Sequence, residues 1–171
     1  MAGKVIGKTL PFGFRGNPSR NPDTIIDSFV NTGDDIIEYG EPVVFDPTTK
    51  GVRKIKSTDT GTVLVVGIAV RRVGQPYADS PDGYYYKKHD MVDVLIRGSV
   101  TVELAATTGI AAHGNVYVRN GANEDNAAGG IVCQAATGTG ADTVQIPNAV
   151  FTIGEYDANN IAEITILTRS I

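Results

Sequence analysis

The sequence predicts an all-β protein, either a β-sandwich or a squashed β-barrel, with an extended N-terminal arm. Of its 171 residues, 52 are Val, Ile or Thr, and only five are Leu. Side chains that branch at Cβ lose rotamer freedom in a helix and pack well on a pleated sheet, so this ratio excludes a helical bundle. Alternating apolar and polar residues between 92 and 104, and Gly, Asn and Asp clusters between short apolar segments, favour the same fold class.

Length and composition suit one domain, or one domain with an arm. The chain is 42% apolar and 20% charged, as ordinary globular domains are. Its longest apolar run, Val63 to Val70, has eight residues, far fewer than the ~20 needed to cross a bilayer. Since the N-terminus has no apolar stretch typical of a signal peptide and Cys133 is the single cysteine, we expect synthesis and folding in a reducing cytoplasm.

Charge is distributed unevenly along the chain, whose formal net charge is −4. Residues 1–20 contain four basic residues and no acid, whereas residues 98–171 contain seven acids and two basic residues. Proteins that bind nucleic acid usually carry a basic domain. The acidic body therefore predicts that nucleic acid is not a partner.

Residues 1–22 are predicted to form the extended arm, because glycines and prolines throughout them leave no room for a regular helix. Leu10, Phe12 and Phe14 alternate as the side chains on one face of an extended segment do. Two interpretations remain open. The arm is either a strand that closes the core of its own domain or an anchor that lies on a neighbouring protein.

The β-rich domain is predicted over residues 23–171. An apolar segment at 25–30 is followed by a hairpin, with a strand at 42–45, a turn at 46–51 and a second strand at 52–56. The run 62–70 is apolar on both faces and predicts a central strand that is covered on both sides.

A loop rich in tyrosine is predicted at 74–90. It is long for a connection in a compact domain and contains Tyr77, Tyr84, Tyr85 and Tyr86. Tyrosine offers a large contact area at a low entropic cost, so the cluster favours a protein interface. The alternative is that some of these rings only hold the loop against its own domain.

The clearest strand pattern covers residues 92–104. Its length predicts a bend or bulge at Gly98, where the strand passes between two sheets. Further short strands are predicted at 115–118, 131–134, 143–146, 149–153 and 161–167.

The sequence offers little for catalysis. Acid–base and nucleophilic mechanisms need a positioned His, Cys or Ser with a partner, and the available candidates are His89, His113 and Cys133. Their surroundings are a charged loop segment, a Gly/Ala-rich turn and a short apolar strand. We therefore predict no enzyme activity, no catalytic or cofactor-binding residues, no metal site and no small-molecule substrate.

Four stretches, residues 17–30, 94–104, 114–121 and 143–169, resemble the structural cement, or decoration, proteins of tailed bacteriophage heads. The resemblance implies a small β-rich protein that binds the outer surface of an expanded capsid after synthesis in the cytoplasm of the host bacterium. It also implies that the protein bridges neighbouring major capsid proteins, commonly as a homotrimer at or near threefold positions. The family has no catalytic residues to carry over.

Under this resemblance, the partners are the major capsid protein and further copies of the chain, with no membrane partner. Apolar side chains of the arm would supply binding energy, and its basic residues would steer it to an acidic surface. The main alternative is a virion-surface module that binds a receptor or carbohydrate. The predicted contact residues are Lys4, Lys8, Leu10, Phe12, Phe14, Arg15, Tyr77, Tyr84, Tyr85 and Tyr86.

Overall fold

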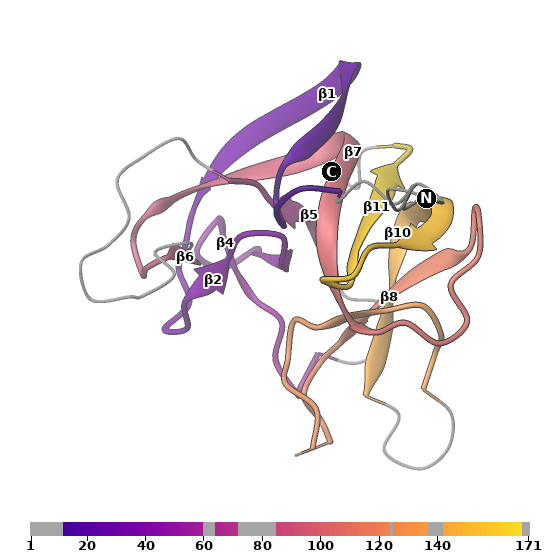
Figure 1. The fold of residues 1–171 in the computed structure, drawn as a ribbon. Helices are drawn as coiled ribbons and strands as arrows, with labels where there is room; N and C mark the ends of the chain where they lie inside the picture. The colour runs from indigo at the N-terminus through magenta and orange to yellow at the C-terminus, as the bar shows by residue number, and fades with distance from the viewer. Residues whose placement is uncertain (1–11, 60–63, 72–84, 124, 137–141, 169–171) are drawn as a thin grey trace, which may run out of the picture.

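The computed structural model describes residues 12–59, 64–71, 85–123, 125–136 and 142–168 (Figure 1). Within these ranges the chain forms strands and no helix, and therefore contains no helix that could cross a membrane. The predicted all-β class is confirmed. The strands are β1 Pro18–Val30, β2 Ile37–Glu38, β3 Pro42–Asp46, β4 Gly51–Lys54, β5 Val65–Ala69, β6 Tyr85–Tyr86, β7 Met91–Ala106, β8 Asn115–Arg119, β9 Ile131–Val132, β10 Thr143–Tyr156 and β11 Ile161–Ile166.

Five strands close into a barrel, which confirms the squashed-barrel prediction. Strands β7, β11, β10, β8 and β9 pair in that order, and β9 pairs with β7 to complete the circle. The closing β7–β9 pair is parallel, and the other four are antiparallel. Buried side chains such as Val100, Phe151 and Ile164 belong to the core that fills the barrel.

A second apolar core lies beside the barrel. Strands β1, β7, β5, β3 and β4 pair in that order around it, and a bridge between Asn31 and Val52 joins the end of β1 to β4. Strand β5 is buried along its whole length, as predicted for a central strand. Ile37, Tyr39 and Tyr86, in or next to the small β2–β6 sheet, complete this core.

Strand β7 contributes to both cores and changes direction at Gly98. Up to Arg97 it pairs with the second half of β1 and with β5, and from Gly98 onward it pairs with β11 and β9. The φ angle of Gly98 is +114°, and a Cβ atom there would lie 3.0 Å from the Cα atom of Thr24. The predicted irregularity at Gly98 is confirmed. Residues of one parity enter the second core before it (Val92, Val94, Ile96) and the barrel core after it (Val100, Val102, Leu104).

Strand β1 crosses the predicted arm boundary at residue 22. It rises beyond the body of the molecule and folds back (Figure 1), and its pairing with β7 is irregular between Pro18 and Ile26. The Arg20 guanidinium donates two hydrogen bonds of 2.9 Å to the Glu163 carboxylate of β11. The described part of the predicted arm thus lies against its own domain, and a separate arm is not confirmed. Residues 1–11 lie outside the described residues.

The other predicted strands are found with shifted ends. The 46–51 turn joins β3 and β4 as a hairpin, and the segments at 115–118 and 161–167 form β8 and β11. The segment at 131–134 is shorter than predicted, and the segments at 143–146 and 149–153 form one strand, β10, rather than two. Its register with β8 shifts between Gln145 and Val150.

Candidate functional site

The segment from Phe12 to Gly16 is held on the body by backbone hydrogen bonds. The Gly16 N–H donates to the Thr101 carbonyl at 2.7 Å, and the Gly16 carbonyl accepts from the Arg71 N–H at 2.7 Å. The Thr101 hydroxyl donates to the Phe14 carbonyl at 2.6 Å. At the start of the segment, the Phe12 N–H donates to the Asp157 carboxylate at 3.0 Å. The segment is therefore held by β7, by the residues that follow β5 and by the turn between β10 and β11.

Phe14 projects from this anchored backbone into solvent. Its side chain is the most exposed of the described large apolar residues, at 64%. The Arg71 guanidinium lies over the ring, 5.2 Å from its centroid, and such cation–π contacts favour one ring position. We call Phe14, Arg15 and Arg71 the Phe14 surface.

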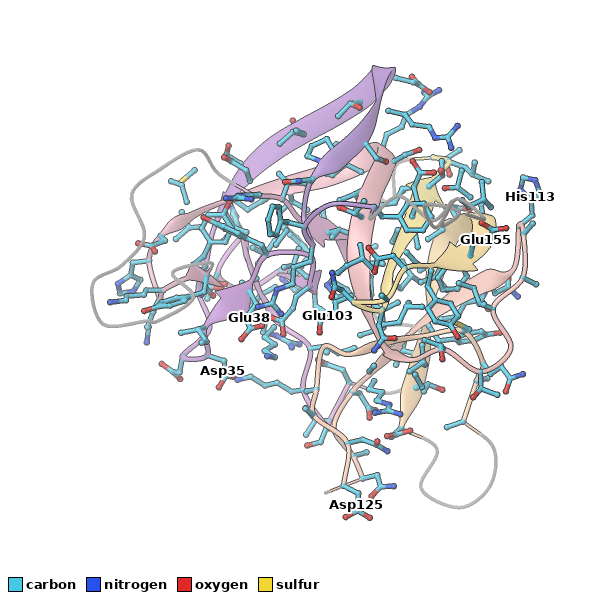
Figure 2. The ribbon with its side chains drawn as sticks, viewed as in Figure 1. Asp35, Glu38, Glu103, His113, Asp125 and Glu155 are labelled. Carbon is cyan, nitrogen blue, oxygen red and sulfur yellow. The ribbon has the colours of Figure 1, made fainter. Side chains whose placement is uncertain are left out.

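Arg15 is paired within the molecule. Its Nη1 atom lies 2.6 Å from Glu38 Oε2 and 3.4 Å from Glu103 Oε2. Figure 2 shows both carboxylates near the centre of the view, Glu38 from β2 and Glu103 from β7. Arg15 was predicted to steer an arm toward an acidic partner, and that role stays a prediction. Within the chain, Arg15 fixes the segment against two acidic residues of its own domain.

A hollow of about 290 Å³ lies beside Phe14. Tyr39 and Ile161 contribute apolar walls, and Glu103 and Arg15 lie at its border with a second hollow of about 270 Å³. Recognition sites commonly combine an apolar floor with a few charged groups of this kind. The Phe14 surface therefore offers a partner both a projecting ring and an adjacent recess.

Asp157 organises the turn between β10 and β11 and the start of the anchored segment. It is buried and accepts hydrogen bonds from the backbone N–H groups of Phe12, Asn159 and Ile161 at 2.8–3.0 Å. Burial alone would raise the pKa of Asp157, but these three donors outweigh it and hold the pKa below its ordinary value. The ionised form is therefore the one that anchors Phe12.

The Asp157→Asn variant is expected to lose about 1–2 kcal/mol of unfolding free energy at pH 7, because amide groups accept weaker hydrogen bonds than carboxylates. Since the folded-state pKa is lowered, the stabilisation is fully present above the unfolded-state value of about 3.9 and is lost as pH falls through the folded-state value. The difference between wild type and variant, measured by urea unfolding, should therefore shrink between pH 5 and pH 2. Asp125→Asn, at an exposed turn, is the matched control. A difference that is constant with pH would contradict this role.

The predicted tyrosine cluster includes one residue in the second core, one half-buried residue and two that lie outside the described residues. Tyr86 is only 3% exposed, its hydroxyl donates to the Val70 carbonyl at 2.7 Å, and its ring meets that of Tyr39 edge-on at 5.2 Å. For Tyr86 the alternative holds, since it fixes its strand against its own domain. Tyr85 is half-buried, with the Lys87 ammonium 5.8 Å from its ring centroid. Tyr77 and Tyr84, with Lys4, Lys8 and Leu10, lie outside the described residues.

Sequence reasoning missed the residues that hold the segment in place. Arg71, Glu38 and Glu103 are far from Phe14 along the chain, and no local pattern links them to it. Asp157 had a local signal, because an aspartate two residues before Asn159 is typical of a turn in which the carboxylate accepts a backbone N–H. That pattern did not reveal the third donor, Phe12.

Residues with catalytic potential have other surroundings. Cys133 is buried, and its thiol donates to the Ala106 carbonyl at 3.6 Å. Burial raises the pKa of Cys133, which favours the thiol over the nucleophilic thiolate. His89 and His113 occupy exposed turns with φ of 70° and 59°. Among the described residues, no group of three or more His, Cys, Asp or Glu is placed to hold a metal ion.

Comparisons with known proteins agree with the fold. The model of a family described as "Structural cement protein (E217 gp24/Pam3 gp6)" matches residues 3–167. The fold is similar to that of a chain in the solved structure "The capsid of Myoviridae Phage XM1", with a TM-score of 0.67, 20% sequence identity and 98% of each chain covered. No curated protein matches the sequence.

Proposed function

The chain belongs to the structural cement protein family and has a capsid-decorating, stabilising role; we propose that it performs this role on the outer surface of the head, by bridging neighbouring major capsid proteins as a homotrimer. The observation that carries this proposal is the exposed Phe14 ring on an anchored backbone. Aromatic side chains presented in this way supply much of the energy at protein interfaces, because little entropy is lost when they bind.

Linked copies give a physical reason for bridging. When one copy of a homotrimer is bound, the remaining contacts become intramolecular, and overall attachment can exceed a single contact by ~100-fold to 10,000-fold. Modest contacts at each Phe14 surface then suffice. Attachment should also require the assembled shell, because isolated capsid proteins do not present correctly spaced sites together.

Such a protein acts through the surface area that it buries against its partners. The family is structural, and the buried Cys133 thiol is in the less nucleophilic state. We propose that the chain has no catalytic activity and takes no small-molecule substrate.

Phe14→Ala is expected to weaken attachment to expanded heads by about 30-fold for each contact, which corresponds to the ~2 kcal/mol typical of a central aromatic anchor. The measurement is co-sedimentation of purified protein with heads that lack it, over a range of protein concentrations. Because the ring is exposed, the unfolding midpoint should be unchanged. Leu167→Ala, which truncates another exposed apolar residue, is the control.

If Phe14→Ala attaches to heads as strongly as wild type does, the Phe14 surface is not part of the interface. The mass of the free protein, measured by light scattering, tests the proposed homotrimer separately. Binding to cell-surface glycans with no binding to heads would favour a receptor- or carbohydrate-binding module instead.

A further inference from the structure

Strand β1 has an open edge. Among the described residues it pairs along its length with β7 only, and from Ile26 to Val30 the register is unbroken, opposite Leu95 to Met91. The irregular stretch before Ile26 bounds the edge at one end, and the bridge from Asn31 to Val52 bounds it at the other. We call Ile26–Val30 the β1 edge.

The β1 edge has few of the features that normally prevent strand addition. Proteins protect such edges with lysine, proline, bulges or covering segments. The β1 edge contains neither lysine nor proline, and its register has no bulge. Ile26 is 42% exposed, and exposed Val30 lies opposite exposed Met91 on the neighbouring strand. These apolar side chains lie on either side of the hydrogen-bonded Ser28–Asp93 pair on one face of the edge.

The charge of the β1 edge indicates the chemistry of its partner. Asp27 is exposed and makes no ion pair among the described residues. The neighbouring Asp93 carboxylate accepts the Ser28 hydroxyl at 2.6 Å. An added strand with an acidic residue opposite Asp27 would be repelled, whereas lysine or arginine there would be attracted. The edge thus fits an extended apolar segment that carries a basic side chain.

The β1 edge also lies close to the Phe14 surface. The Asp93 carbonyl accepts the Val70 N–H at 2.8 Å, while the Asp93 carboxylate holds Ser28 of β1. Val70 directly precedes Arg71, whose guanidinium covers Phe14. Strand β7 and the Val70–Arg71 segment therefore lie between the β1 edge and the segment that carries Phe14.

We propose that an extended segment of the major capsid protein adds to the β1 edge as an extra strand, with a basic side chain facing Asp27. This inference rests on the proposed function, since it names where the capsid protein is held. Backbone hydrogen bonds would supply affinity, and side-chain contacts with Ile26 and Asp27 would supply specificity.

The test replaces Ile26 with lysine, which exchanges an exposed apolar side chain at one end of the β1 edge for a charge that the added strand would cover. Ile26→Lys is expected to weaken co-sedimentation with expanded heads by about 10-fold or more, and Asp27→Lys should also weaken it by reversing the charge. The matched control is Ile36→Lys, because Ile36 is similarly exposed, at 45%, and lies outside β1. Both β1 residues are exposed, so unchanged unfolding midpoints are expected, and Asp27→Lys keeps the test valid if Ile26→Lys does not fold.

Loss of binding by both β1 variants, with full binding by wild type and Ile36→Lys, supports the proposal. Full binding by the β1 variants overturns it and leaves the proposed function intact. If either β1 variant changes the mass of the free protein, the edge is an interface between copies and the proposal is wrong. Failure of wild type itself to bind heads would overturn the proposed function and this inference together.

Discussion

Replacing Phe151 with alanine is expected to lower the free energy of unfolding by about 3–5 kcal/mol, the usual cost of removing a fully buried aromatic ring. Phe151 is completely buried in the barrel core and lies opposite Ile164 on the paired strand β11. Its backbone is fixed on the other side by hydrogen bonds with Gly114 and His113. Because the barrel is closed, its strands cannot move together freely, so most of the vacated volume should remain as a cavity.

Urea unfolding followed by far-ultraviolet circular dichroism measures this loss. Ile153→Ala is the control, because Ile153 lies on the same strand and is 39% exposed, so its loss should stay near 1 kcal/mol or less. Equal losses in the two variants would show that the barrel does not carry the main core.

Gly98→Ala is expected to cost about 3 kcal/mol, from two effects. A φ of +114° is strained for any residue with a Cβ atom, and the new methyl group would lie 3.1 Å from the Asp23 carbonyl oxygen and 3.0 Å from the Thr24 Cα atom. Since those neighbours are backbone atoms of β1, relieving the contact requires β1 to move away from β7.

Gly13→Ala separates these effects. Gly13 has a φ of +100°, but the nearest atom to an added Cβ, in the Asn17 side chain, is 3.7 Å away. Its substitution should therefore cost only the backbone strain, about 1 kcal/mol. Thermal unfolding of both variants checks the comparison. If the Gly98 variant is as stable as the Gly13 variant, β1 moves away from β7 at little cost in free energy.

Strand β7 shows how far the sequence could predict the fold. Alternation identified the strand, and its length together with Gly98 identified the bend. What the pattern could not show is that residues of one parity enter different cores on either side of Gly98. Every one of those positions is apolar, and side-chain character alone does not distinguish one apolar core from another.

Other elements depended on tertiary contacts that no local pattern reports. Pro147 and Asn148 were interpreted as a break between two strands, but pairing with β8 and β11 carries the chain through them as β10. Strands β2 and β6 have two residues each, too few for any periodicity. The Tyr86 ring of β6 packs edge-on against Tyr39, which directly follows β2.

The contact role of the candidate site stays a prediction. Phe14 was singled out from its spacing, and the structure exposes its side chain. The roles of Arg15 and Tyr86 depended on Glu38, Glu103 and the Val70 carbonyl, which are distant in sequence. A charged or aromatic side chain outside a regular strand pattern is equally suited to a partner or to its own domain, and only the fold distinguishes the two.

Strand β7 has a mechanical consequence for the proposed bridging. It is hydrogen-bonded to β1 and β5 at one end and to β11 and β9 at the other, so tension between two proteins bound at the two ends would be transmitted along one continuous backbone. Such a load would shear several ladder hydrogen bonds at once instead of opening them one by one. A strand that runs without a break between two bound proteins would therefore resist their separation better than two separate strands.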